Sequence, residues 1–217
     1  MTSHTEQESN NRQPKRRYLS ASERKQEILE AAFDEFSRHG FVATSLERIA
    51  NRAGISKSGI YTHYNSKNDI FEDVLATVLL PEDHRVPDLD ICSTLSLPQV
   101  LDRYLDKRYE TLKTPKAIAA FRLLIAESGR TPKLVQETVQ NLLKRCLSGD
   151  HNFIHACLKN KNLKSNINID EYLLASTPAG LLLILHAVFG EQALPVAVAH
   201  IKALHKRLLL ELLQSIA

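Results

Sequence analysis

The chain has 217 residues, and its 28 Lys and Arg against 25 Asp and Glu leave a net charge of +3, too small to indicate a nucleic-acid partner by itself. The excess lies at the N-terminal end, because residues 1–67 hold 11 basic and 8 acidic side chains and the remainder is balanced. A composition of 43% hydrophobic and 24% charged residues excludes a disordered or collagen-like chain. The aromatic content of 6% and the absence of Trp favour helices over aromatic-rich strands.

The three cysteines, Cys92, Cys146 and Cys157, form no Cys-x-x-Cys pair, and their odd number argues against a disulfide framework. The N-terminal residues lack the apolar core of a signal peptide. The longest apolar stretch, residues 179–190, is shorter than a helix that crosses a bilayer. We therefore expect a soluble protein of the reducing cytoplasm.

The N-terminal end predicts a disordered arm followed by one helix. Residues 1–20 are polar, and they contain the basic cluster Arg12, Lys15, Arg16 and Arg17. Apolar residues then recur at helical spacing from Ile28 to Phe36, and Gly40 is a signal for the end of that helix.

Two short helices joined by a tight turn are predicted next. Thr44-Ser45-Leu46-Glu47 is a capping box, so the second helix is expected to begin at Thr44. Gly54 permits the left-handed conformation that a sharp turn needs, and Ser56 can cap a third helix that starts at Lys57. A second box, residues 66–69, opens a fourth helix.

The rest of the chain predicts further helices after an irregular connection at residues 81–98. Helical periodicity covers residues 100–112, 118–125, a segment opened by Pro132, and about 170–189 and 196–215, with a polar loop at 159–169. No run with the period of a strand competes, so the expected fold is all-α. The predicted parts are a basic arm at 1–20, a helix-turn-helix domain at 21–66 and a helical regulatory and dimerisation domain at 67–217.

The third helix has a surface suited to duplex DNA. Its outward residues are small, polar and weakly basic, so they can enter a major groove without a steric or charge penalty. A helix-turn-helix pattern alone is also typical of an ordinary helical corner. More specific is the resemblance of residues 24–75 to the DNA-binding domain of TetR/AcrR-type transcriptional regulators. The matching residues are 28–33, Phe36, Gly40, Phe41, 44–46, Ile49, Ala50, 53–61, His63, Tyr64 and Lys67.

The resemblance implies a division of DNA contacts within this segment. Base-facing residues would be Lys57, Ser58, Gly59 and Thr62, and phosphate contacts would come from Thr44, Ser56, Tyr61, His63 and Lys67. Lys57 can donate to guanine O6 or N7, and Gly59 lets the backbone approach closely. Thr44 and Ser56 are also expected to be plain helix caps, and a cap and a phosphate ligand can be the same residue. Two roles stay open for the basic arm at residues 1–20, which are contact with a DNA minor groove and unspecific attraction to DNA.

One short recognition helix reads too few base pairs for genomic specificity, so a homodimer is expected. The family implies a four-helix bundle between two copies of the last two helices. The candidate interface residues are Leu181, Leu185, Phe189, Ile201, Leu204, Leu208 and Leu212. Residues 170–189 are apolar nearly all round, which indicates burial on every side. Two recognition helices would then meet major grooves about 34–36 Å apart.

The family also implies a small-molecule pocket between the helices of residues 98–160. Residues 122–127 with Pro132 resemble, more weakly, the regulatory domains of the AcrR and AefR branches. Helical position suggests the pocket residues Tyr104, Phe121, Arg122, Ile125 and His186, although core packing or surface pairing also explains each of them. The resulting hypothesis is a repressor that a ligand releases from its operator, cytoplasmic and nucleoid-associated when bound.

Other classes of function are less well supported. Residues 54–58 lack the final Gly and the preceding strand of a nucleophile elbow, and no P-loop, dinucleotide fingerprint or HExxH motif occurs, so no enzyme is expected. His151 and His155, near Asp150 and Cys157, lack a compact ligand set, so we expect neither metal nor cofactor. A DNA-bound adaptor without an inducer stays open. A closed apolar cavity would favour the sensor, and a filled bundle with an exposed groove would favour the adaptor.

Overall fold

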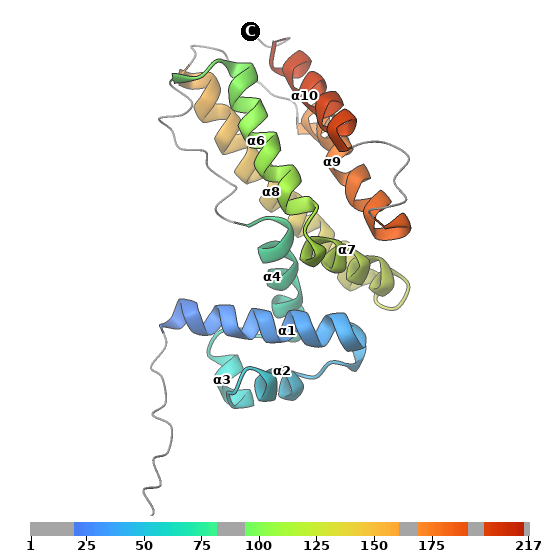
Figure 1. The fold of residues 1–217 in the computed structure, drawn as a ribbon. Coiled ribbons are helices and arrows are strands. Elements are labelled where there is room, and N and C mark those ends of the chain that lie inside the picture. The colour runs from blue at the N-terminus through green and yellow to red at the C-terminus, as the bar shows by residue number, and fades with distance from the viewer. Residues whose placement is uncertain (1–19, 82–93, 161–168, 191–197, 215–217) are drawn as a thin grey trace, which may run out of the picture.

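The computed structural model of the chain describes residues 20–81, 94–160, 169–190 and 198–214 (Figure 1). Within these residues every regular element is a helix, which confirms the all-α prediction. The helices are α1 (Ala21–Ala43), α2 (Leu46–Arg52), α3 (Lys57–Tyr61), α4 (Lys67–Leu79), α6 (Leu97–Leu112), α7 (Pro115–Ser128), α8 (Pro132–Asn160), α9 (Ile169–Phe189) and α10 (Val198–Gln214).

Helices α1, α2 and α3 form a small unit at one end of the molecule, where α2 and α3 lie against one side of α1 (Figure 1). The helical run of α1 is interrupted at Gly40, whose φ of 76° is the left-handed conformation expected at its end. The unit is held by a compact apolar core. Its fully buried members include Ile28, Ala32, Phe36, Ile49 and Ile60.

Helix α4 connects this unit to the rest of the chain. Ser66 accepts the N–H of Asp69, and the Asp69 carboxylate accepts the N–H of Ser66, so the predicted capping box is formed. Ile70, Phe71 and Leu75 are fully buried in one apolar core that α4 shares with α1, α7 and α8. The two predicted domains therefore meet across continuous apolar packing.

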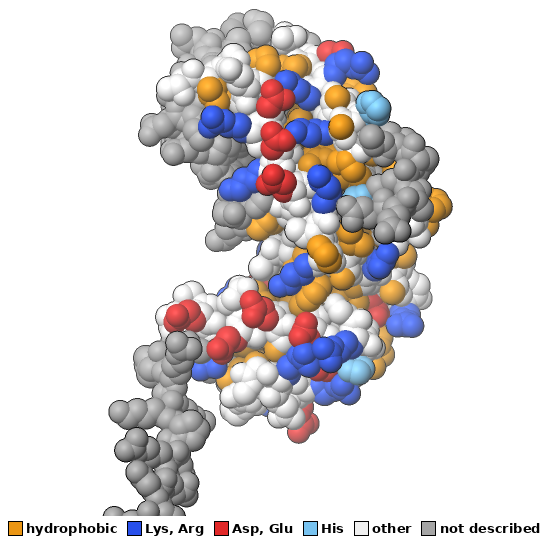
Figure 2. Space-filling model, in the orientation of Figure 1, with side chains coloured by type: hydrophobic (Ala, Val, Ile, Leu, Met, Phe, Trp, Pro, Cys, Tyr) orange, Lys and Arg blue, Asp and Glu red, His pale blue; other side chains and the backbone are white. Residues whose placement is uncertain are grey.

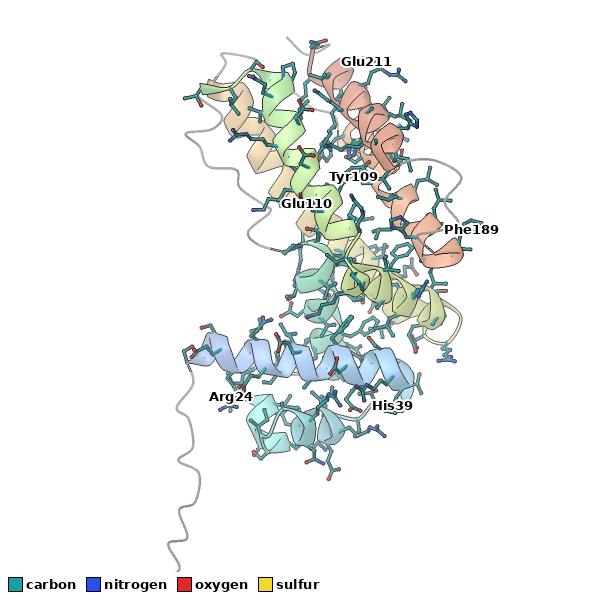
Figure 3. All side chains as sticks on the ribbon, viewed as in Figure 1. Arg24, His39, Tyr109, Glu110, Phe189 and Glu211 are labelled. Atoms are coloured by element: carbon teal, nitrogen blue, oxygen red, sulfur yellow. The ribbon has the colours of Figure 1, made fainter. Side chains whose placement is uncertain are left out.

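The remaining helices form a second bundle, in which α6, α8, α9 and α10 follow its long axis (Figure 1). Tyr109 of α6 points toward α10, where its hydroxyl lies 3.2 Å from Nδ1 of the buried His205 (Figure 3). Helix α9 contains Pro178, which cannot donate to the carbonyl of Leu174. The hydroxyl of Thr177 donates to that carbonyl instead, at 2.7 Å, so α9 continues past the proline.

Helix α9 is the one described helix that is long and apolar enough to span a membrane, with a mean hydropathy of 1.8 from Asp170 to Phe189. The apolar stretch identified in the sequence, residues 179–190, covers only the C-terminal half of this helix. Helix α9 packs against α10 and α7 within the bundle, and core helices of soluble proteins have the same composition. A single such helix is therefore weak evidence for a membrane.

Some sequence predictions concern residues outside the described part of the chain. They are the basic arm, most of the connection predicted at 81–98 and of the loop predicted at 159–169, Cys92, and the side chains of the metal candidates Asp150, His151, His155 and Cys157. Among the described residues, no group of three His, Cys, Asp or Glu side chains could hold a metal ion.

Candidate nucleic-acid interface

The corner between α2 and α3 is built from local signals in the sequence. Gly54 adopts a φ of 66°, and the N–H of Ile55 donates to the carbonyl of Ala50 at 3.0 Å, closing the turn. Ser56 caps α3 as predicted, accepting the N–H of Gly59 at 3.1 Å. Ile60 is fully buried, so the opposite face of α3 is turned to solvent.

The solvent-exposed face of α3 contains the residues that were predicted to contact bases. Lys57, Ser58 and Thr62 are exposed, and Gly59 is partly exposed. The hydroxyl of Thr62 donates to the carbonyl of Gly59 at 2.7 Å, and Ser58 Oγ lies 2.9 Å from Ser56 Oγ. The result is a small polar surface of hydroxyls and one ammonium group at the free end of the molecule (Figure 1).

The two tyrosines near the end of α3 have opposite environments. Tyr61 is 51% exposed, whereas Tyr64 is buried and lies beneath Lys25, with Nζ 5.1 Å from the ring centroid. Burial and the nearby Asp73 carboxylate raise the pKa of Tyr64. Tyr61 can therefore reach a phosphate, and Tyr64 packs in the core. His63 is partly exposed beside them.

Thr44 does not occupy the position that its sequence pattern suggested. Ser45 is the N-cap of α2 and accepts the N–H of Arg48 at 3.2 Å. Thr44 is 1% exposed, and its hydroxyl donates to the carbonyls of Gly40 at 2.8 Å and Glu35 at 3.2 Å. The prediction that α2 begins at Thr44 is wrong by two residues, because the kink at Gly40 turns this hydroxyl into the core.

Lys67 is also directed inward. Its Nζ donates to the carbonyls of Phe41 at 2.8 Å and Thr44 at 2.7 Å, and it lies 4.1 Å from the Phe41 ring centroid. Burial lowers the pKa of Lys67, and the negative charge of Glu127 opposes this effect. Lys67 therefore stabilises the segment after Gly40, and the structure does not bring Lys67 or Thr44 to the surface of α3.

The charged contacts that fix α2 on α1 were missed from the sequence. Arg48 Nε donates to the Glu35 carboxylate at 2.9 Å, and Arg52 bonds both Glu35 and Asp34. The hydrogen bond from Arg48 outweighs burial and lowers the pKa of Glu35. The spacing of Arg48 and Arg52, one turn apart on α2, was the available signal.

Comparison with known proteins identifies this helix-turn-helix. Residues 28–74 match the family model described as bacterial regulatory proteins, tetR family. The helix-turn-helix domain of this chain is therefore a TetR-family domain. The chain is 31% identical over 126 residues to the uncharacterized HTH-type transcriptional regulator YhgD of Bacillus subtilis, a match that covers 58% of this chain and 64% of YhgD. The chain therefore spans less than two thirds of that relative's length.

Solved TetR-family structures share the whole fold. A putative TetR-family transcriptional regulator from Mesorhizobium loti has a TM-score of 0.63 at 20% identity, covering 91% of this chain and 98% of that structure. NalD of Pseudomonas aeruginosa, described as the secondary repressor of the MexAB-OprM multidrug efflux pump, has a TM-score of 0.57 at 20% identity, covering 90% and 99%. The second bundle therefore has the same fold as in these structures.

A buried carboxylate on α7 connects that second bundle to the helix-turn-helix. Glu127 is fully buried and accepts the N–H of Phe41 at 3.0 Å. Arg130 lies 3.6 Å from it, and the hydroxyl of Thr131 donates to it at 3.5 Å. A Cβ on Gly40 would lie 2.7 Å from Glu127 Oε1, so the carboxylate would have to shift from its place beside the Phe41 N–H, and the φ of 76° separately favours glycine.

A second connection joins α8, α4 and α1 through charges. Arg145 bonds Glu72 at 3.0 Å and Asp73 at 3.1 Å, and Asp73 also bonds Lys25 at 2.9 Å. Asn141 donates to Glu72 at 2.7 Å. Burial acts to raise the pKa of Asp73, but hydrogen bonds from Lys25 and Arg145 outweigh it and lower the pKa. No sequence pattern indicated which charges these helices would pair.

The second bundle holds a cavity of about 440 Å³ between the end of α4 and helices α6, α7, α8 and α9. Of the predicted ligand residues, Phe121 lines it. Tyr104 is buried beside it, Arg122 donates to the carbonyl of Ala187, and Ile125 is 47% exposed on α7. His186 is buried, and neither ring nitrogen has a hydrogen-bond partner among the residues that the structure describes. The structure does not bring these five side chains together.

The predicted dimer residues divide between the surface and the interior. Leu181, Phe189 and Leu204 are 41–58% exposed, and Phe189 points away from the bundle (Figure 3). Leu185, Leu208 and Leu212 are partly buried. Ile201 is buried in the core that α10 shares with α6 and α9, so it is not part of the exposed surface. Hydrophobic side chains are visible over α7 and α9 in Figure 2. The exposed Ile184 of α9 was missed from the sequence.

Proposed function

We propose that this chain is a sequence-specific DNA-binding repressor that acts as a homodimer and leaves its operator when a small molecule binds. The observation that carries the proposal is the exposed polar face of α3 on a capped, glycine-hinged corner. The relatives named above are transcriptional regulators, and NalD is described as a repressor, which supports the same class of function. A cytoplasmic location and the absence of enzymatic activity belong to this proposal.

The DNA-contacting role is assigned to the residues that the structure exposes. Lys57 supplies a donor for guanine, and Ser58 and Thr62 supply hydroxyls that can donate or accept. Ser56 and Tyr61 are placed beside them for phosphate contacts, with Ser56 at the N-terminus of α3. Thr44 and Lys67 act indirectly, by fixing the segment from which α2 starts.

Dimerisation is assigned to α9 and α10 because apolar side chains remain exposed there. Leu181, Ile184, Val188 and Phe189 are 47–60% exposed on α9, and Leu204 is 41% exposed on α10. The first three lie on one face, because they are spaced by three and four residues. Pairing this face with its copy across a two-fold axis would bury it and form a four-helix bundle.

The cavity is partly open to solvent, so it is not the fully closed cavity that would decide for a sensor. We favour a sensor over an adaptor because the lining is mainly Leu, Val and Phe and the volume lies in the range of small-molecule sites. A ligand shifts an equilibrium only by binding the DNA-incompetent state more tightly, and couplings of about 1–3 kcal/mol are typical. The Glu127 and Arg145 contacts are the described polar connections through which such a change can reach α1 and α4.

The test begins with duplexes selected by the protein from a random pool, followed by affinity measurements with the substitution Lys57→Ala. We expect weaker binding by about 1–3 kcal/mol and relaxed base preference, because Lys57 donates to bases and carries no described structural contact. Lys133→Ala on α8, which removes the same charge from a 90% exposed side chain, is the matched control and should bind as the parent does. If the parent protein enriches no sequence from the pool, the proposal is contradicted. If Lys57→Ala and Lys133→Ala bind with equal affinity, Lys57 does not contact the bases.

A further inference from the structure

We propose that the cavity binds an uncharged, apolar molecule, and that Gly180 of α9 leaves the space that this molecule occupies. The inference rests on the proposed function, because it names the class of ligand that the sensor would detect. Two properties of the cavity wall carry it. The polar side chains among the described lining residues are engaged within the wall, and the wall contains a glycine that the helix itself does not require.

Most of the wall is aliphatic or aromatic, and Phe121 and Leu183 are representative lining residues. Lining residues that also reach solvent include Val139, Leu143 and Leu174, which are 37–69% exposed, so the wall stays largely apolar at the opening of the cavity. Such a surface binds a ligand through the hydrophobic effect, whose contribution grows with the apolar area removed from water. We therefore expect the body of the ligand to be a hydrocarbon chain or ring.

The one charged side chain among the described lining residues, Arg108, has its guanidinium held within the wall. Its Nη1 donates to Tyr104 Oη at 3.1 Å, its Nη2 donates to Cys146 Sγ at 3.2 Å, and its Nε has almost no accessible surface. A carboxylate would have to displace these contacts before it could pair with Arg108, and an ammonium group would meet a charge of its own sign. The guanidinium therefore belongs to the structure of the wall.

The hydroxyl groups of the wall are engaged or buried as well. Tyr172 Oη lies 3.3 Å from Tyr104 Oη, and the hydroxyl of Thr177 donates to the carbonyl of Leu174 at 2.7 Å. Ser176 lines the cavity, but its Oγ has almost no accessible surface. An ionised headgroup inside the cavity would lose its water without gaining a partner from the described lining residues, which is unfavourable for either sign of charge. The lining therefore selects an uncharged molecule.

Gly180 gives independent support for a ligand. It lies near the middle of α9, where glycine is less favourable for a helix than residues with a side chain. It lines the cavity on the stripe of α9 formed by residues 173, 176, 180 and 183, all of which are lining residues. A Cβ at Gly180 would meet no atom within 4 Å, so close packing inside the chain does not explain the glycine. The missing side chain instead leaves its volume to the cavity.

The first test compares three probes with the same alkyl chain, namely 1-octanol, octanoate and octylammonium, which are titrated into the full-length protein at pH 7 by calorimetry. We expect 1-octanol to bind about tenfold or more tightly than either ion, because its headgroup loses the least on leaving water. Tighter binding of octanoate or of octylammonium, or equal binding of the three probes, would overturn the inference.

The second test fills the cavity with Gly180→Leu, which should fold because leucine is a better helix former than glycine. We expect 1-octanol to bind about tenfold or more weakly than in the parent, because the new side chain occupies the space of several methylene groups of the ligand. Gly129→Leu, at the end of α7, is the matched control and should bind as the parent does. A Cβ at Gly129 also meets no atom within 4 Å, and this residue does not line the cavity.

Circular dichroism and light scattering establish that the variants are folded and dimeric. Unchanged binding of 1-octanol by Gly180→Leu, or an equal loss in Gly129→Leu, would overturn the role of Gly180. Loss of the dimer in Gly180→Leu would assign the glycine to the contact between subunits and would also overturn it. If Gly180→Leu does not fold, Gly180→Ala takes its place, and it should show a smaller loss of affinity; an affinity equal to that of the parent would then refute the role.

The proposed function can fail separately from this inference. A protein that selects no duplex would refute the function, while the titrations would still decide the class of ligand. Release of the selected duplex by octanoate or octylammonium but not by 1-octanol would leave the function standing and refute the uncharged ligand.

Discussion

The contact between Glu127 and Phe41 provides a direct test of how the two parts of the chain are joined. The change is Glu127→Ala, which removes the carboxylate and leaves the Phe41 N–H without its acceptor. A hydrogen bond to a charged acceptor contributes about 1.5–3 kcal/mol, and a buried donor left unsatisfied costs about 1–3 kcal/mol; the two figures overlap and do not add. Because Glu127 is fully buried, water cannot replace the lost contact without rearrangement.

The other partners of Glu127 contribute less or act in the same direction. Arg130 is 3.6 Å away with a side chain 64% exposed, so this ion pair contributes about 0–1 kcal/mol. Lys67 loses the negative charge that supports its protonated form, and that loss adds to the destabilisation. We therefore expect a total loss of about 2–4 kcal/mol, and a fall in melting temperature of about 5–15 °C for a chain of this length. Glu127→Gln keeps an acceptor for Phe41 and should lose about half as much.

The assay is thermal unfolding followed by circular dichroism, with protein concentration held constant because dimerisation changes the apparent stability. Arg130→Ala is the control for the exposed partner and should melt within about 2 °C of the parent. A melting temperature of Glu127→Ala equal to that of the parent would refute the role assigned to this carboxylate. So would an equal loss in Arg130→Ala, because the ion pair would then dominate.

Three further predictions concern the DNA surface, the charged cluster and the dimer. Gly59→Ala should fold, because the new Cβ would lie at an ordinary contact distance of 3.4 Å from Ser56 Oγ. Its affinity for the selected duplex, measured by fluorescence polarisation, should fall about tenfold, because the methyl group prevents close approach of the backbone to the bases. Unchanged affinity would contradict that close approach. Asp73→Asn should cost about 1 kcal/mol in urea unfolding near neutral pH. Because the pKa of Asp73 is lowered in the folded state, its contribution to stability is present above about pH 4 and should diminish as the pH falls further. A difference in unfolding free energy between parent and Asp73→Asn that does not change with pH would refute the ion pairs. Light scattering should show that Ile184→Glu is monomeric. Ile125→Glu, at a residue that is also 47% exposed but lies on α7, should stay dimeric. The opposite result would indicate that the interface is formed by α7 and not by α9.

The helix-turn-helix could be predicted because its signals are local. A glycine at positive φ, a serine that accepts an N–H three residues later, and a reciprocal capping box each depend on a few neighbouring residues. These features at Gly54, Ser56 and Ser66 are therefore present as expected. Thr44 and Ser45 are both good capping residues, and only the path of the chain after the kink at Gly40 decides between them.

A pocket was expected from the family resemblance, but most of its lining residues could not be predicted, because helical periodicity identifies an apolar face and not the helix that it meets. Arg122 and Ile125 have suitable positions on α7 but face outward, whereas Arg108 and Ser176 reach the cavity from α6 and α9. Long-range ion pairs have the same difficulty. The bond between Arg145 and Asp73 joins residues 72 positions apart, and no local rule selects that pair from the many charges of the chain.

The positions of the two interdomain contacts suggest how ligand binding could be transmitted. Leu124 of α7 lines the cavity, and Glu127, one turn later, holds Phe41 at the end of α1. Cys146 of α8 also lines the cavity, and the neighbouring Arg145 holds Asp73 of α4. A ligand that separates α7 from α8 would therefore move these two attachments by different amounts. Because α1 and α4 share one close-packed core, that difference would appear as a tilt of the whole helix-turn-helix and not as a local deformation. In a dimer, such a tilt changes the distance between the two recognition helices. Operator binding requires that distance to stay close to one turn of DNA.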